Sequence, residues 1–347
     1  MFSLQKLFRA AALAVPLIAV QVSAVACKPT KTAPQAAVAT LVDFGFPSWA
    51  ENLAVRSNGQ ILVSRLDSPA VYQVDPVSST ASLVYAWNAS EYMGCLGISE
   101  TVEDVFFVIA SAMVDDDFVK TSGVNSIYKI DMTNAKTPSE AIVTHLVDIT
   151  PADFLNGMTT LDSTHILVSD VYSGVIYVVD TVTGAYSVAI DDPKMKFSYV
   201  ADPPTNLGSN GIKIFNGHLY WTNTAAGFLA RIPIDSTGRA TGASSIAATN
   251  VPKADDFIIR SDGVAFICQN QMDTLSIAYL SSGSVVAQPI AGSNTSTLMA
   301  GVSAAKFGRT KSDSTRLYLT TTGGLALPIN GTVLVDGTVS YISTTQY

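Results

Sequence analysis

The sequence predicts an all-β fold, a six-bladed β-propeller, and two observations support this prediction. The stretch from Ala50 to Asp75 alternates three short apolar strands with turns at residues 57–59 and 66–69, which would make most of one antiparallel sheet. This pattern returns five times further along the chain, twice in weaker form. Because one such sheet cannot bury its own faces, six copies indicate blades that pack around a common axis.

The copies match strand by strand. ILVSR from Ile61 returns as ILVSD from Ile166, and VYQVD returns as VIYVVD. We name the equivalent position at which each copy begins the start residue of its blade. The predicted start residues are Glu51, Gly94, Asn156, Asn210, Asp255 and, approximately, Val302. Their spacings of 43, 62, 54, 45 and 47 residues fit blades of about 40–50 residues with loops of variable length.

The repeats are expected to form a single domain at residues 41–347, after a short segment at 27–40. The chain has 347 residues, 48% of them hydrophobic and 14% charged, which is ample for a large core, and no linker or charge run interrupts the repeats. Ring closure is predicted to place Leu41–Phe46 in one blade with the late sequence VLVDGTVSYI.

The first 26 residues are predicted to be a secretory signal peptide. Lys6 and Arg9 precede an uncharged run that ends in small residues, with cleavage expected near residues 24–26. A lipoprotein signal at Cys27 is disfavoured because the usual Leu before the Cys is missing. Three glycosylation sequons begin at Asn88, Asn294 and Asn330. We therefore expect a secreted or secretory-lumen glycoprotein with no stable membrane insertion after cleavage.

Composition excludes several classes of function. The formal net charge of −8 argues against nucleic-acid binding, which needs clustered Lys and Arg. Three cysteines, Cys27, Cys95 and Cys268, are too few to staple the fold, and Cys95 and Cys268 are expected to pack in the core rather than act as nucleophiles. CxxC, HExxH, GxSxG and P-loop patterns are all missing, so common hydrolase and nucleotide chemistries have no local support.

Four start residues are candidate metal ligands. The first strand of each propeller blade lines the central channel, so residues at one repeat phase are expected to converge at one mouth. Two carboxylates and two amides suit a hard cation such as Ca²⁺. These candidates are Glu51, Asn156, Asn210 and Asp255. The alternative, that Asn-Gly and Asp residues here serve only as turn residues that bond their own backbone, remains open.

The loops between the second and third strands of the blades are expected to open on the same mouth. They carry polar and aromatic residues that would suit a small-molecule pocket, although a solvated rim is the simpler alternative. These residues are Arg65, Asp67, Asp170, Tyr172, Asn223, Asn270 and Gln271, with Trp49 and Trp221 nearby.

Other polar residues are expected to be structural. The aspartates that end the third strands of their blades should serve blade turns. They are Asp75, Asp131, Asp180 and Asp235. His165 and His218 precede second strands, at the opposite mouth, and His145 lies in an outer strand. A histidine base, and with it a His-dependent lactonase mechanism, is therefore disfavoured.

The start residues resemble those of the regucalcin and gluconolactonase family of six-bladed propellers. The resemblance is carried by Glu51, by Asn156-Gly157 and by Asp255-Asp256-Phe257 with the following SDGVAFI. It implies that the matching Glu, Asn and Asp bind a divalent metal and that the Asp is a base in lactone hydrolysis. The second blade departs from the family pattern, because Gly94-Cys95 stands where a polar substrate-binding residue is expected.

A second resemblance covers longer segments. WAENLAVRSNGQILVSRLDSPAVYQVDP, SAAKFG and LYLTTTGG resemble secreted fungal propellers that include hetero-Diels-Alderases of tropolonic sesquiterpene pathways. This implies an enzyme, a pericyclase without a metal or other cofactor, that joins a tropolone quinone methide to a humulene-type alkene. Such a reaction needs apolar substrates held in register and hydrogen bonds to the quinone oxygen.

Three hypotheses follow: this pericyclase, a divalent-metal-dependent lactonase or esterase using the four candidate ligands, and a non-catalytic small-molecule-binding propeller. For the pericyclase, the candidate catalytic residues are Arg65, Tyr172, Asn223 and Gln271. The candidate substrate-binding residues are Trp49, Trp221, Asn270 and Asp170.

Overall fold

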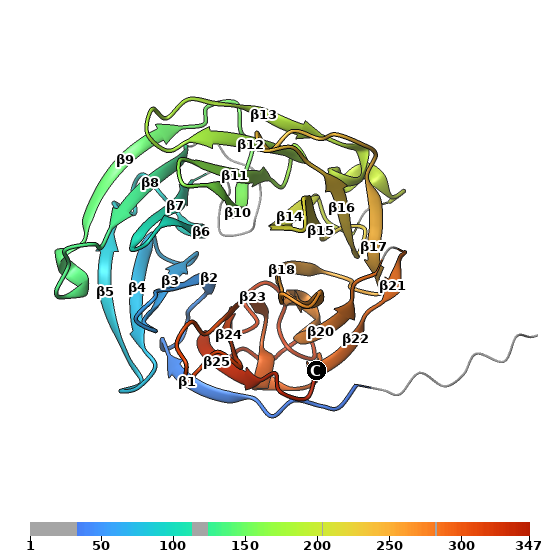
Figure 1. Cartoon of the computed structure of the whole chain (residues 1–347). Helices are drawn as coiled ribbons and strands as arrows, with labels where there is room; N and C mark the ends of the chain where they lie inside the picture. The colour runs from blue at the N-terminus through green and yellow to red at the C-terminus, as the bar shows by residue number, and fades with distance from the viewer. Residues whose placement is uncertain (1–32, 113–123, 203, 282) are drawn as a thin grey trace, which may run out of the picture. The chain divides into compact units, whose positions relative to one another are not determined.

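Six antiparallel β-sheets are arranged in a ring within residues 33–347 (Figure 1). The computed structural model describes residues 33–112, 124–202, 204–281 and 283–347, so the predicted signal peptide and Cys27 lie outside the described residues. Each sheet is one blade, and neighbouring first strands contact one another around a closed circuit, β2 to β6, β10, β14, β18, β23 and back to β2. The predicted six-bladed β-propeller is confirmed.

The strands of each blade run in order from the channel outward. Blade 1 contains β2 (Ala50–Val55), β3 (Ile61–Arg65), β4 (Ala70–Asp75) and β5 (Thr80–Ala86). Blade 2 contains β6 (Gly94–Val102), β7 (Val105–Ser111), β8 (Asn125–Asp131) and β9 (Ile142–Asp148). Blade 3 contains β10 (Leu155–Asp162), β11 (His165–Asp170), β12 (Val175–Asp180) and β13 (Tyr186–Asp191).

The remaining blades follow the same plan. Blade 4 contains β14 (Ser209–Phe215), β15 (His218–Asn223), β16 (Phe228–Pro233) and β17 (Ser245–Thr249), with β21 (Val285–Val286) added in parallel at its edge. Blade 5 contains β18 (Ala254–Ile259), β19 (Val264–Gln269), β20 (Thr274–Tyr279) and β22 (Gln288–Gly292). Blade 6 contains β23 (Val302–Phe307), β24 (Arg316–Thr321), β25 (Thr338–Ser343) and β1 (Ala39–Asp43). Short 3₁₀ turns are η1 (Pro138–Glu140), η2 (Pro193–Met195), η3 (Phe197–Tyr199), η4 (Asn270–Met272) and η5 (Thr297–Met299).

Blade 6 closes the ring with strands from both ends of the domain. Its outermost strand, β1, pairs antiparallel with β25, with Ala39 opposite Tyr341 and Asp43 opposite Thr338. This confirms the predicted closure, although of the late sequence only the part from Thr338 forms a strand. Such pairing joins segments from the two ends of the domain in one blade and so closes the ring.

A β-bulge interrupts the first strand of every blade where that strand begins. The residues skipped by the pairing register are Glu51, Leu96-Gly97, Asn156-Gly157, Asn210-Gly211, Asp255-Asp256 and Ser303. A bulge breaks strict alternation and re-aims a side chain. The register also corrects two start residues, because the blade 2 equivalent is the buried Leu96 and not Gly94, and the blade 6 equivalent is Ser303 and not Val302.

The glycines in these bulges allow adjacent blades to come close. A Cβ added at Gly157 would lie 2.3 Å from the carbonyl oxygen of Asn210, and one added at Gly211 would lie 2.6 Å from the Cα of Asp256. Real Cβ atoms do not tolerate such distances to backbone atoms. The close approach of the next blade therefore requires a glycine after Asn156 and after Asn210, and this explains the two Asn-Gly sequences.

Hydroxyl groups on second strands donate to the backbone of the next blade. We name these contacts the inter-blade hydroxyl bonds. Each runs to the carbonyl oxygen of a bulged start residue, and in this way the bulge of one blade is fixed by its neighbour. They are Ser64 to Leu96 (2.6 Å), Ser169 to Asn210 (2.6 Å), Thr222 to Asp255 (2.5 Å) and Thr320 to Glu51 (3.3 Å). Ile109 and Cys268 occupy the matching register in blades 2 and 5.

Cysteines and histidines lie where the sequence predicts. Cys95 and Cys268 are buried and unpaired among the described residues, and burial raises the pKa of both thiols well above the usual value. His165 and His218 begin second strands, and His145 lies in the outermost strand of blade 2. In the part of the chain that the structure describes, no helix has the length and apolar character needed to cross a membrane.

Aspartates at the ends of third strands bind the turns that follow, as predicted. Each carboxylate accepts a backbone N–H two residues further on. The bonds are Asp75 from Val77 (2.8 Å), Asp131 from Thr133 (3.1 Å), Asp180 from Val182 (2.8 Å) and Asp235 from Thr237 (2.8 Å). The Val77 N–H lowers the pKa of Asp75, and hydroxyl hydrogen bonds from Thr133 and Thr237 lower the pKa of Asp131 and Asp235.

These turns predict a specific acid sensitivity. Because the pKa of each Asp is lower in the folded protein than in the unfolded chain (about 3.9), its stabilising effect is complete above the unfolded-state pKa. The effect is lost as the pH falls through the folded-state pKa. The variant D75N/D131N/D235N keeps an acceptor in each turn but cannot titrate. We expect its Tm to fall less than that of the wild type between about pH 5 and pH 2. Equal slopes in the two Tm profiles would contradict this account.

Candidate functional site

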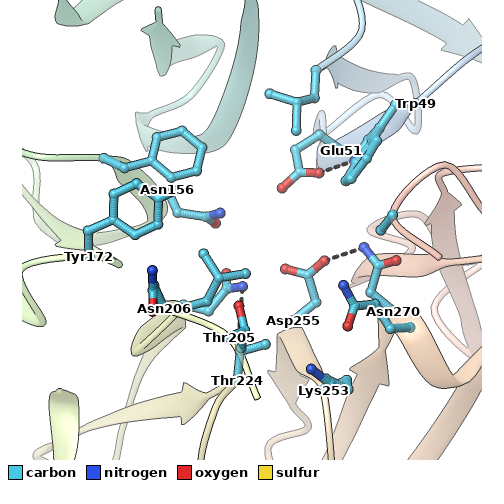
Figure 2. Close-up of a pocket in the computed structure, with 16 residues that line it drawn as sticks. Trp49, Glu51, Asn156, Tyr172, Thr205, Asn206, Thr224, Lys253, Asp255 and Asn270 are labelled. Carbon is cyan, nitrogen blue, oxygen red and sulfur yellow. Dashed lines mark hydrogen bonds between the residues drawn. The ribbon is translucent and has the colours of Figure 1, made fainter. Parts of the chain in front are cut away.

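A pocket of about 370 Å³ lies at the mouth of the channel where the start residues converge (Figure 2). Its lining comes from start residues, from loops between second and third strands, and from the segment that precedes β14. The volume falls in the range of roughly 300–1,000 Å³ found for small-molecule sites. The sequence-based prediction that these two sets of residues share one mouth is confirmed by this common lining.

The pocket lining contains apolar and polar side chains, and we name these two sets the apolar wall and the polar wall. Their members alternate around the pocket, since Trp49 lies beside Glu51 and Tyr172 lies beside Asn156 (Figure 2). The apolar wall consists of Trp49, Leu66, Phe154, Tyr172, Leu207 and Ala326. The polar wall consists of Glu51, Asn156, Asn210, Thr224, Asp255 and Asn270. Phe154 and Tyr172 contact each other with ring centroids 5.3 Å apart and planes tilted by 45°. A molecule bound here would contact both rigid aromatic surface and hydrogen-bonding groups.

Glu51 is a buried carboxyl group with one donor from its own strand segment. The indole Nε1 of Trp49 donates to Glu51 Oε2 (Figure 2). Burial, followed by the negative charge of Asp255, raises the pKa of Glu51 well above the usual value, while the indole bond acts in the opposite direction. The uncharged form of Glu51 is therefore more favoured in this pocket than that of a glutamate exposed to water.

Asp255 is the second buried carboxyl group of the polar wall. Asn270 Nδ2 donates to Asp255 Oδ2 at 2.8 Å (Figure 2). Burial raises the pKa of Asp255 to about 7. The hydrogen bond from Asn270 opposes this rise, and the negative charge of the neighbouring Asp256 adds to it. Two carboxyl groups with raised pKa in one pocket mark a site built at the expense of stability, which is typical of functional sites.

Two amide oxygens in the polar wall are buried and have no hydrogen-bond partner among the residues that the structure describes. Asn210 donates through Nδ2 to Thr224 Oγ1 at 3.2 Å, and Thr224 in turn donates to the Ala254 carbonyl at 2.6 Å, yet Asn210 Oδ1 has no partner. Asn270 Oδ1 is also unpartnered. Such acceptors normally find a donor, a water molecule or a cation.

Asn156 differs from these amides, because its whole side-chain amide is available. It lines the pocket and is buried, and no residue in the described ranges hydrogen-bonds to its side chain. Figure 2 shows its amide directed toward the space in front of Glu51 and Asp255. An amide has two N–H donors, so Asn156 offers a donor to a bound molecule.

The four predicted metal ligands do line this one pocket. Glu51, Asn156, Asn210 and Asp255 present oxygen atoms from four blades, and the orphaned Asn210 Oδ1 is an acceptor that a cation would satisfy. These groups fit a Ca²⁺ ion, which would act as a Lewis acid on a bound carbonyl. No group of three or more His, Cys, Asp or Glu side chains suited to a metal occurs within the described residues, so amides would have to complete the shell.

Half of the other predicted site residues lie in the pocket. Trp49, Tyr172, Asn270 and Gln271 line it. Arg65 does not: its guanidinium pairs with Asp67 at 2.5 Å and lies 4.9 Å from the Phe44 ring centroid. Asp170 does not either, since its carboxylate accepts backbone N–H groups of Asp153, Phe154, Tyr172 and Ser173. Both instead shape the loops of their blades.

Trp221 and Asn223 also lie outside the pocket and support its edge indirectly. Trp221 is fully buried, and its Nε1 donates to the Lys194 carbonyl at 3.2 Å. Asn223 Nδ2 donates to the carbonyls of Lys194 and Lys196, each at 2.9 Å. The segment anchored in this way continues to Thr205, Asn206 and Leu207, which line the pocket.

Several lining residues have no counterpart among the sequence-predicted candidates. They are Leu66, Phe154, Thr205, Asn206, Leu207, Thr224, Lys253 and Ala326. Phe154 and Lys253 precede the start residues of their blades by two positions, so the repeat phase contains a signal for them. The segment before β14 lies outside the repeat, and repeat phase therefore gives no signal for Thr205 to Leu207.

Comparison with known proteins finds two relatives that span most of the chain. A protein of Sarocladium schorii named "Putative hetero-Diels-Alderase" is 29% identical over 336 residues, covering 86% of this chain and 82% of the relative. A protein of a Phoma species with the same name is 26% identical over 298 residues, covering 79% and 83%. No protein-family profile matches the chain. The resemblance to hetero-Diels-Alderases predicted from the sequence is confirmed.

Solved structures confirm that the fold is similar to that of regucalcin-like propellers. A luciferin-regenerating enzyme aligns with a TM-score of 0.65 and 12% identity, covering 89% of this chain and 95% of that chain. A regucalcin of Agrobacterium tumefaciens, described as a calcium-binding protein, aligns with a TM-score of 0.59 and 12% identity, covering 90% and 97%. At this identity the similarity concerns the fold alone.

The inter-blade hydroxyl bond from Thr222 predicts a measurable stability loss. Thr222→Val keeps the shape but leaves the Asp255 carbonyl without this donor, so we expect the free energy of unfolding to fall by about 1–3 kcal/mol. Thr222→Ser keeps a hydroxyl and is the matched control, which should retain most of the stability. Chemical denaturation measures both variants. A Thr222→Val protein as stable as the wild type would contradict the role of this bond.

Proposed function

We propose that the protein is a pericyclase of the hetero-Diels-Alderase type that joins a tropolone quinone methide to a humulene-type sesquiterpene. The observation that supports this most is the pocket that combines aromatic side chains with the Asn156 amide, to which no described residue hydrogen-bonds. The two relatives named as hetero-Diels-Alderases supply the reaction class. The substrates in this proposal are apolar small molecules, and the site uses no cofactor.

The reaction needs no proton transfer and no leaving group. The C=C–C=O unit of the quinone methide adds across one alkene, so that one C–C bond and one C–O bond form together and every atom is retained. Electron density grows on the former carbonyl oxygen as these bonds form. A hydrogen-bond donor at that oxygen therefore stabilises the transition state more than the ground state.

Asn156 is the residue best placed to supply this donor. Its amide lies between Tyr172 and the two buried carboxyl groups (Figure 2), and no described residue competes for its N–H groups. Asn210, by contrast, already donates to Thr224. In the proposed mechanism, Asn156 polarises the oxygen, while Gln271 at the rim of the pocket is a further donor.

The apolar wall would hold the two reactants in register. Trp49, Phe154 and Tyr172 present large surfaces with few rotatable bonds, which limit the entropy lost when an apolar substrate binds. Fixing two reactants in one cavity converts a bimolecular step into an effectively unimolecular one. None of the three histidines lines the pocket, and neither does Cys95 or Cys268, so a nucleophilic mechanism has no side chain of these types in it.

A divalent-metal-dependent lactonase or esterase is the second candidate function. The convergence of Glu51, Asn156, Asn210 and Asp255, together with the unpartnered Asn210 oxygen, favours it. In that case all four side chains would hold the ion, and loss of any of them would reduce metal affinity. The two functions therefore assign different roles to Asn210.

We also propose that the protein is a glycoprotein of the secretory pathway or the cell exterior. Asn88, Asn294 and Asn330 are all exposed, as an oligosaccharide acceptor must be. After expression in a eukaryotic secretory host, treatment with a peptide N-glycosidase should lower the mass of the wild type. The variant N88Q/N294Q/N330Q should show no such change, and an unchanged wild-type mass would contradict the proposal.

Paired substitutions of Asn156 and Asn210 test the proposed function. Asn156→Ala removes the donor, and we expect the rate of adduct formation from a quinone-methide precursor and humulenol to fall by about 10²-fold. Asn210→Ala removes an amide that donates within the wall, and it should have a much smaller effect. Product is measured by chromatography against the uncatalysed reaction in buffer.

The same variants address the metal-dependent alternative. Calorimetric titration with Ca²⁺ should show no coupling between metal binding and adduct formation if the pericyclase proposal holds. Equal losses of activity in Asn156→Ala and Asn210→Ala, or Ca²⁺ binding that disappears in Asp255→Ala together with activity, would contradict the pericyclase and favour the lactonase.

A further inference from the structure

Three buried side chains from three different blades meet beneath the pocket. Asn52 of β2 donates through Nδ2 to Asp256 Oδ2 of β18 at 3.1 Å, and the Lys213 ammonium of β14 pairs with Asp256 Oδ1. Blades 1 and 5 are not neighbours in the ring, because blade 6 stands between them. The Asn52–Asp256 bond therefore crosses the channel.

The position of these side chains places them below the pocket lining. Asn52 and Asp256 directly follow the lining residues Glu51 and Asp255, and Lys213 lies three residues beyond Asn210. First strands begin at the pocket and run down the channel. None of the three side chains lines the pocket itself. Together they form a layer across the channel, which we name the channel floor.

The channel floor contains one residue, Asp256, that differs from the residues at the equivalent position of the preceding blades. The second bulge residue is Gly157 in blade 3 and Gly211 in blade 4, whereas blade 5 has Asp256 at this position. A Cβ built on Gly211 would lie 2.4 Å from Asp256 Oδ1, so the glycine of blade 4 makes room for this carboxylate. The carboxylate and the space for it are thus matched across the blade interface.

The three side chains of the floor are buried, and its two charged groups pair with each other. Relative exposure is 4% for Asn52 and only 6% and 3% for the side chains of Lys213 and Asp256. Asp256 Oδ1 also accepts the Phe257 N–H at 2.8 Å, and Asn52 Oδ1 accepts the Leu53 N–H at 2.9 Å. The Lys213 ammonium lies 5.4 Å from the Phe257 ring centroid.

Stability alone does not explain a buried Lys–Asp pair in this place. Desolvation of two charges offsets most of their attraction, and apolar side chains of similar volume stabilise a protein as well or better. A hydrogen-bonded ion pair instead fixes the relative positions of the groups that it joins, since each bond has a defined direction. Here the joined strands, β2 and β18, carry Glu51 and Asp255.

We infer that Asn52, Lys213 and Asp256 are positioning residues for the proposed cycloaddition, in that they close the channel beneath the pocket and exclude water from it. This inference rests on the proposed function. Water entering from the channel would add to the exocyclic carbon of the quinone methide and give an alcohol in place of the cycloadduct. A closed floor suppresses this competing addition, whereas the apolar wall and Asn156 promote the cycloaddition.

Variants of the floor test this inference through product partitioning. Asn52→Ala removes the bond across the channel and leaves the Lys213–Asp256 pair intact, and Asp256→Asn keeps the shape but removes the charge. We expect the ratio of cycloadduct to water adduct to fall by about threefold to tenfold, the range that corresponds to one lost hydrogen bond. KM should change little. The matched control is Asp104→Asn, which weakens the Arg56–Asp104 pair (2.8 Å) beyond the far end of β2.

A second measurement is independent of the reaction. The neutral dye prodan, bound in the pocket, reports local water by the wavelength of its emission. Its emission should shift to the red in Asn52→Ala and Asp256→Asn and stay unchanged in Asp104→Asn. If the wild type forms no cycloadduct, the proposed function fails, and the dye alone decides the role of the floor. Unchanged emission in both floor variants, with native circular dichroism, would overturn the inference.

Discussion

The structure depends on the contact between the start of each blade and the blade before it. Hydroxyl groups of Ser169 and Thr222 donate to the carbonyls of Asn210 and Asp255, and Gly157 and Gly211 leave room for the same backbone segments. The side chains of Asn210 and Asp255, whose backbone is held in this way, belong to the polar wall. The positions of these start residues therefore follow from the packing of rigid strands in neighbouring blades, while loops supply much of the remaining lining.

This arrangement explains how the propeller can keep two carboxyl groups in a partly apolar pocket. Burial raises the pKa of both Glu51 and Asp255. The charge of Asp255 raises the pKa of Glu51 further and the charge of Asp256 that of Asp255, while hydrogen bonds from Trp49 and Asn270 act in the opposite direction. The turn aspartates differ, because their carboxylates accept backbone N–H groups of the turns that follow them. Strain of this kind persists only where the surrounding fold enforces it.

The repeat phase predicted the fold, the ring closure and the convergence of Glu51, Asn156, Asn210 and Asp255, because periodicity maps directly onto equivalent positions in space. It misplaced the blade 2 start residue, since a bulge adds residues that the phase alone does not show. Trp221 and Asn223 were predicted to lie in the pocket because they are at the end of a second strand, near the loop that follows it. Their side chains instead anchor Lys194 and Lys196, in a segment outside the repeat whose path no periodic pattern describes.

The central claim is that this pocket directs a cycloaddition between a quinone methide and an alkene. The most direct test is the stereochemical composition of the adduct formed from a quinone-methide precursor and humulenol with purified wild-type protein, measured by chiral chromatography against buffer alone. The account predicts one dominant stereoisomer in higher yield with the protein than in buffer. The same isomer mixture and yield with and without protein would contradict it.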